Sequence, residues 1–105
     1  RVAVLNGKKG FDPVFISARA GETVTLSAAG SRDPDGDRIS YKWWVYDEAG
    51  SPLASPQATL AGADTAEATL TVKAASAPVH VILEVRDDGT PSLVAYRRAV
   101  IAVRP

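Results

Sequence analysis

Cysteine is absent from this 105-residue sequence, and its absence limits how the chain can be held together. Without cysteine there is neither a disulfide framework nor a zinc site built on thiolates. The fold must therefore rest on a packed hydrophobic core, for which the 46% of hydrophobic residues is sufficient. No apolar run approaches the roughly 20 residues that a membrane span requires, so no membrane partner is expected.

An excess of charge of either sign is also lacking. The twelve basic and twelve acidic residues cancel and are interspersed along the chain. The longest basic runs are the pairs Lys8-Lys9 and Arg97-Arg98, which are too short for the basic surface that nucleic-acid binding requires. Nucleic acid is therefore not an expected partner.

The sequence lacks a set of residues arranged for catalysis. Its single histidine, His80, lies in the middle of an alternating segment, with no serine or cysteine nucleophile placed around it. No glycine-rich loop leads from a strand into a helix, which excludes phosphate binding of that kind. Aspartates do occur close together, but a loop at the tip of a small domain offers no cleft for glycoside hydrolysis. We therefore expect a non-catalytic domain.

Helical periodicity is missing from every segment of useful length, and alternation of apolar and polar residues takes its place. In residues 20–28, Val24 and Leu26 face one way, while Thr23 and Thr25 face the other. The same period of two recurs in three further segments, residues 39–46, 65–72 and 79–87, and residues 93–103 form a last strand that is rich in Val, Ile and Tyr. With the shorter apolar runs and the Gly, Pro and Asp turns, this predicts one all-β domain over residues 1–105. Its expected fold is a two-sheet antiparallel sandwich of immunoglobulin-like type, with about seven strands.

Two adjacent tryptophans divide residues 39–46 into an inner and an outer face. Neighbouring side chains of a strand point to opposite sides, so Trp43 and Trp44 cannot share one. Trp43 falls in phase with the other apolar residues of the segment and is predicted to lie in the core. Trp44 and Tyr46 are then left on the outer face of the sheet together with Lys42.

The neighbours of this outer pair follow from the expected topology. The strand that carries His80, Ile82 and Glu84 pairs alongside and places these three side chains on the same outer face. The last strand adds either Tyr96 or Arg97, because its register is ambiguous. An outward aromatic pair beside an apolar side chain is unusual on a solvated sheet face and often marks a binding surface.

Three interpretations of this outer face stay open. In the first, Trp44 and Tyr46 stack against the apolar faces of sugar rings. Polar neighbours would then bond the sugar hydroxyls, namely Lys42, His80 and Glu84. In the second, the face packs against another domain of a longer protein, which we expect because the chain opens on Arg1 and shows no signal peptide. In the third, the Gly- and Pro-rich loop after Glu48 covers it.

Acidic loops form a second candidate site. The loops at residues 30–38 and 87–92 fall at the same end of an immunoglobulin-like sandwich. Together they gather five carboxylates, those of Asp33, Asp35, Asp37, Asp87 and Asp88. Such oxygen clusters bind hard cations such as calcium, but the same residues also cap turns, and both interpretations stay open. An EF-hand is excluded, because Arg38 stands where its glycine should be and Trp44 where its glutamate should be.

Two long strings of the sequence are similar to PKD-like modules, which are β-sandwiches of secreted and surface proteins. The first string resembles the opening half of these modules and reads AGETVTLSAAGSRDPDGDRISYKWWVY. It contains a G-x-x-V-x-L strand, an S-x-DPDGD loop and a Y-x-W strand. The second string resembles their closing half and reads VHVILEVRDDGTPSLVAYRRAVIAV. The usual W-x-F-G-D-G motif is replaced by WWVYDEAG, so general PKD properties carry over weakly.

A fuller set of motifs is more specific. Five shorter strings together resemble the C-terminal domain of a bacterial family of cellulose-binding proteins. They are NG, DPDGD, YKWWVYDEAG, ILEVRDDGTP and YRR. The N-terminal part of these proteins is similar to nucleoside hydrolases. The resemblance covers nearly the whole chain, and it implies an exported protein, extracellular or periplasmic, in which this domain follows the hydrolase-like one. Any hydrolase chemistry, and the calcium that it uses, would belong to that other domain.

The residues and the resemblance together give two hypotheses for function. In the first, the chain is an accessory module that binds a polysaccharide such as cellulose through Trp44 and Tyr46. In the second, it is a structural module that docks on its own N-terminal domain with the same face. Calcium at the acidic loops is compatible with either hypothesis.

Overall fold

The computed structural model describes residues 3–8, 10, 12–31, 38–46, 58–73, 78–89 and 92–104. These residues contain seven strands: β1 (Val14–Arg19), β2 (Thr23–Ser27), β3 (Ile39–Tyr46), β4 (Ala58–Ala61), β5 (Glu67–Val72), β6 (Val79–Asp87) and β7 (Val94–Arg104). No helix in this part of the chain is long and apolar enough to cross a membrane.

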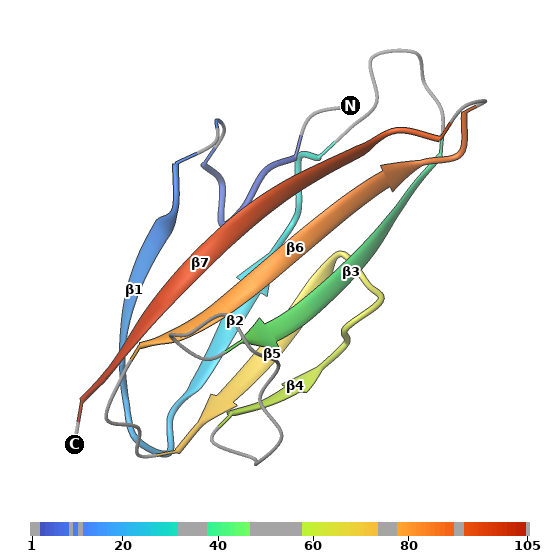
Figure 1. The fold of residues 1–105 in the computed structure, drawn as a ribbon. Coiled ribbons are helices and arrows are strands. Elements are labelled where there is room, and N and C mark those ends of the chain that lie inside the picture. Colours follow the sequence, from blue (N-terminus) through green and yellow to red (C-terminus); the bar gives the residue numbers. More distant parts are fainter. Residues whose placement is uncertain are drawn as a thin grey trace.

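The strands form two stacked sheets (Figure 1). The larger has the order β1-β7-β6-β3, and the smaller has the order β2-β5-β4. The all-β, seven-stranded, immunoglobulin-like sandwich that the alternation predicts is therefore confirmed. It differs from the expectation in one respect: β1 runs parallel to β7, so the larger sheet is mixed and not wholly antiparallel.

The parallel strand arises because the N-terminal segment crosses from one sheet to the other. Before the crossing, the segment bonds to the end of β2, where the Asn6 amide donates to the Ser27 carbonyl (2.8 Å) and the Ser27 amide donates to Asn6 Oδ1 (2.7 Å). A tight turn follows at Asn6 and Gly7, whose positive φ angles of 49° and 76° suit a two-residue hairpin. The chain then passes Pro13 and enters β1 at the edge of the larger sheet.

The core lies between the sheets and takes side chains from both. Its largest fully buried members include Leu26 and Leu70 from the smaller sheet and Leu83 and Ile101 from the larger. Burying one such side chain stabilises the fold by about 1.5–3 kcal/mol, so the inward phase of each strand is strongly specified. Trp43 is buried among them, and its indole nitrogen donates to the Thr65 carbonyl at 2.8 Å.

A buried arginine holds the crossing segment in place. Arg97 points inward from β7 and is only 3% exposed. Its guanidinium donates to the carbonyls of Ala3 (3.2 Å), Lys8 and Asp12 (3.2 Å). These carbonyls lie in the segment that leaves one sheet for the other, so the arginine supplies donors that no neighbouring strand provides. The ambiguous register of β7 is thereby resolved, with Arg97 inside and Tyr96 exposed on the outer face.

Candidate functional site

The pairing of β3 with β6 places the predicted residues side by side. Cross-strand partners are Lys42 with Glu84, Trp44 with Ile82, and Tyr46 with His80. Because paired residues of adjacent strands point to the same side of a sheet, all six lie opposite the core. The positions that alternation predicts are confirmed, while their role in binding stays a prediction.

The same phase can be followed over the whole outer surface of the larger sheet, which we call the aromatic face. Its members are Ser40, Lys42, Trp44 and Tyr46 of β3, His80, Ile82, Glu84 and Arg86 of β6, Val94, Tyr96, Arg98, Val100, Ala102 and Arg104 of β7, and Phe15, Ser17 and Arg19 of β1. Four aromatic rings therefore share one face with several basic side chains.

Trp44 and Tyr46 are partly buried on this face. The Lys42 ammonium nitrogen lies 5.3 Å from the centre of the Trp44 ring. A cation at this distance is attracted to the ring by about 0.5–1 kcal/mol at an exposed site. The lysine therefore occupies one side of the indole, and a sugar that stacks on that side has to displace it at a modest cost.

Glu84 lies in the charged part of the face. Its Oε2 atom is 3.5 Å from Nε of Arg86, and its side chain is mostly buried while that of Arg86 is far more exposed. Lys42 is its partner on β3, and Tyr96 is its partner on β7. The carboxylate therefore has one basic side chain in contact with it and two further polar residues beside it on the neighbouring strands.

Phe15 is a member of the face that the sequence prediction missed. It is 76% exposed and lies on β1, at the opposite edge of the sheet from Trp44. A signal was available in VFISAR, where Val14, Ile16 and Ala18 alternate with Phe15 and two polar residues. That phase puts Phe15 outward with its polar neighbours, although its side chain is apolar.

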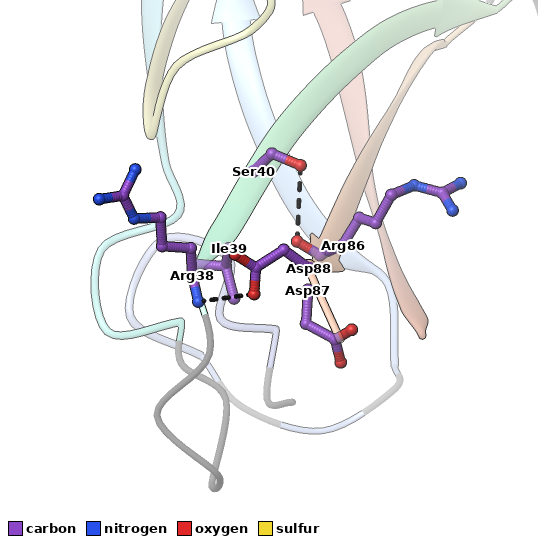
Figure 2. A pocket seen from close by; sticks show the side chains of 6 residues that line it. All are labelled: Arg38, Ile39, Ser40, Arg86, Asp87 and Asp88. Carbon is purple, nitrogen blue, oxygen red and sulfur yellow. Dashed lines mark hydrogen bonds between the residues drawn. The ribbon is translucent and has the colours of Figure 1, made fainter. Parts of the chain in front are cut away.

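Asp87 and Asp88 lie at the end of β6, beside Arg38 and the start of β3 (Figure 2). There Asp87 is buried, and its Oδ1 atom accepts from the amides of Gly89 (3.1 Å) and Leu93 (2.9 Å). Asp88 Oδ1 accepts from the Arg38 amide at 3.1 Å, next to the start of β3. A shallow hollow is lined here by Arg38, Ile39, Ser40, Arg86, Asp87 and Asp88.

These bonds bear on the predicted calcium site. Asp87 and Asp88 act as caps for loop amides, which is the turn chemistry that formed the alternative interpretation. Within the described part of the chain, no group of three or more carboxylate, histidine or cysteine side chains is arranged to hold a metal ion. The other three aspartates of the prediction, Asp33, Asp35 and Asp37, lie outside the described residues. Calcium binding at the five residues stays a prediction.

Comparisons with known proteins point to a carbohydrate-related family. The family model described as "Cellulose-binding protein Sde0182, C-terminal domain" matches residues 23–103. A solved structure from Saccharophagus degradans, a nucleoside hydrolase-related hypothetical protein that is associated with carbohydrate metabolism, has 35% sequence identity and a TM-score of 0.85. The alignment covers 98% of this chain but only 25% of the relative, so the chain spans about a quarter of that protein's length.

More distant structures share only the fold. The PKD domain from the KIAA 1837 protein aligns with a TM-score of 0.58 at 17% identity, over 93% of this chain and 94% of that domain. This similarity agrees with the PKD-like sandwich expected from the motifs. No curated protein matches the chain.

Proposed function

The chain belongs to the family of the C-terminal domain of cellulose-binding protein Sde0182, and from this premise we propose that it binds polysaccharide through its aromatic face. The observation that supports this most directly is the outward pair Trp44 and Tyr46 beside Ile82. These three side chains are partly buried, and an apolar patch of this kind on an outer sheet face often marks a binding surface. Cellulose is the first ligand to test.

The chemistry of the face suits a sugar chain. Aromatic rings offer flat apolar surfaces, and the C–H faces of sugar rings are their natural counterparts. Lys42 donates hydrogen bonds, Glu84 accepts them and His80 does both, so these three can bond hydroxyls around the stacked ring. No reacting group is required of them, and the proposed role is binding alone.

The proposed setting is a longer, exported protein. We place this module after a hydrolase-like domain, as an accessory that brings that domain to its substrate. Any hydrolytic chemistry then belongs to the other domain. The solved relative, of which this chain matches a quarter, supports the idea of additional domains.

A second candidate function is docking on such a domain. The partial burial of Trp44 and Tyr46, and the lysine that lies over the indole, are also compatible with a face that meets protein. In that case the aromatic face would be an internal interface, and the isolated chain would not be retained on a polysaccharide.

The test is a pull-down of the chain on insoluble cellulose, with Trp44→Ala beside the wild type. We expect the wild type to be retained and the variant to bind at least about tenfold more weakly, as for the loss of a central aromatic anchor. Leu93→Ala is the matched control, because Leu93 is 45% exposed but lies just before β7, outside the aromatic face. It should bind like the wild type.

Two results would count against polysaccharide binding. If neither the wild type nor the control is retained on cellulose or on other insoluble β-glucans, the docking role is favoured instead. If Leu93→Ala loses as much binding as Trp44→Ala, retention reflects general hydrophobic adsorption and not a site on this face.

A further inference from the structure

Phe15 is an exposed aromatic residue to which the fold assigns no packing role. At 76% exposure it is the most exposed large hydrophobic side chain among the described residues. The residues that hold β1 on the core are its neighbours of opposite phase, Val14 and Ala18, which are both buried. The strand therefore does not need this ring in order to stay in place.

The strand registers connect Phe15 to the proposed binding surface. Phe15 is the partner of Val100, Val100 is the partner of His80, and His80 is the partner of Tyr46. These four residues form one line at right angles to the strands, which we call the cross-strand row. Adjacent strands lie about 4.8 Å apart, so the row extends about 14 Å from β3 to β1. Figure 1 shows these strands at the two edges of the larger sheet.

The residues of the row itself favour an uncharged ligand, while Arg98 lies in the row beside it with Trp44 and Ile82. No lysine, arginine, aspartate or glutamate belongs to the cross-strand row, and the basic side chains of the face lie in other rows. On one side the next row carries Ala102 and Ser17, which are short and exposed. Nothing bulky therefore stands beside the Phe15 ring on that side, and a flat molecule can approach it.

We propose that Phe15 is a second aromatic platform for polysaccharide, and that a neutral β-glucan chain lies across the strands along the cross-strand row. This rests on the proposed function and specifies its ligand. One end of the chain stacks on the Trp44 and Tyr46 pair, and the other end stacks on Phe15. A single sugar ring cannot span about 14 Å, so only an oligosaccharide of several linked rings contacts both platforms.

Affinity should consequently depend on chain length. Once a glucan is stacked at one platform, its far end is held near the other, and the second contact forms at a high effective concentration. A short sugar gains nothing from Phe15. Removing the ring should therefore weaken the binding of long chains selectively.

The experiment is titration calorimetry of this chain with cellobiose and with cellohexaose. We expect Phe15→Ala to weaken the binding of cellohexaose about tenfold and to leave that of cellobiose unchanged. Phe15→Trp should restore the affinity, because it replaces the ring with another flat platform. Leu93→Ala serves again as the control, since Leu93 is an exposed hydrophobic residue outside the row. The melting temperature of each variant should stay at the wild-type value, because Phe15 contributes little to packing.

The outcomes separate this inference from the proposed function. If Trp44→Ala loses binding while Phe15→Ala binds cellohexaose like the wild type, the second platform is refuted and the first stands. If the wild type binds neither sugar nor insoluble cellulose, both are refuted. If binding falls steeply with salt and is stronger on oxidised, carboxylate-bearing cellulose, the ligand is acidic and contacts Arg98 and Arg104, which overturns the neutral chain.

Discussion

At the scale of single residues, Arg97 links the packing of the fold to the shape of the aromatic face. It is buried, and its guanidinium is satisfied by backbone carbonyls. Its Nε atom is buried without a hydrogen-bond partner among the described residues. Burying a charged guanidinium costs free energy unless its other N–H groups donate hydrogen bonds. Here they fix the crossing segment that leads into β1, and β1 carries Phe15.

Replacing Arg97 with methionine should therefore destabilise the chain. Three buried or partly buried carbonyls would lose their donors, each at a cost of about 1–3 kcal/mol, so we expect a total loss of at least about 3 kcal/mol. Urea denaturation followed by tryptophan fluorescence measures the free energy of unfolding. Arg98→Met is the matched control, because the adjacent arginine is exposed, and a surface change of this kind should stay within about 0.5 kcal/mol. Equal losses in the two variants would contradict the assigned role.

Individual residues also mark the limit of prediction from the sequence. The split of Trp43 inward and Trp44 outward was predictable, because the alternation of β3 has a single phase that buries its apolar residues. Arg97 was not predictable, because Arg97 and Arg98 put an arginine on both faces of β7, and only the carbonyls of the crossing segment decide which arginine is buried. Phe15 could have been placed outward from the polar residues that share its phase.

At the scale of elements, the loop between β6 and β7 is held by a carboxylate. Asp87 lies at the end of β6, is buried, and accepts two amide hydrogen bonds through the same oxygen. The Ser92 hydroxyl donates to the Asp87 carbonyl at 2.7 Å. These bonds tie the end of β6 to the start of the segment that leads into β7, and Asp88 beside them accepts from the Arg38 amide next to β3.

Asp87→Ala should cost about 1–3 kcal/mol of stability, because two partly buried amides lose their acceptor. If Asp87 acts as a turn cap alone, the loss should be the same in EDTA and in millimolar calcium, and the wild type should melt at one temperature in both. Differential scanning calorimetry in the two buffers measures this, with Asp88→Ala as a control for a more exposed cap. If calcium raises the melting temperature of the wild type, and Asp87→Ala abolishes that rise, the five aspartates bind the ion after all.

The elements themselves were largely predictable, but their connections were not. Strict alternation identified β2, β3, β5 and β6, whereas β7 was identified by its Val, Ile and Tyr residues. The parallel pairing of β1 with β7 depends on where the chain crosses between the sheets, and no periodicity records such a crossing. The predicted outward residues around Trp44 lie only on the neighbouring strands β3 and β6. Their positions therefore agree with the expectation, because the pairing of these two strands does not depend on the crossing.

At the scale of the whole molecule, the two outer surfaces differ in chemistry. The outward residues of the smaller sheet are mainly threonines, namely Thr23, Thr25, Thr59, Thr69 and Thr71. Two of them meet across strands, with the Oγ1 atoms of Thr23 and Thr71 3.3 Å apart. Such a surface is well solvated. The larger sheet instead exposes rings and basic side chains, so a partner is expected on one side of the sandwich only.

The absence of cysteine makes this sidedness directly testable. A single cysteine introduced as Ser17→Cys lies on the aromatic face, next to the cross-strand row, whereas Thr71→Cys lies on the threonine surface. Both positions are exposed, so both variants should fold and react fully with a maleimide polyethylene glycol. We expect the polymer at residue 17 to abolish retention on cellulose, because its bulk covers Phe15. The same polymer at residue 71 should leave retention unchanged, since it projects from the opposite sheet.

The unlabelled cysteine variants decide how this result is understood. If both bind like the wild type before labelling, any loss afterwards is steric and locates the partner on one surface. Loss at residue 71 alone would place the ligand on the threonine surface and contradict the role of the aromatic face. Loss at both positions would mean that the polymer repels the chain from cellulose regardless of side, and the sandwich would then have no dedicated binding surface for it.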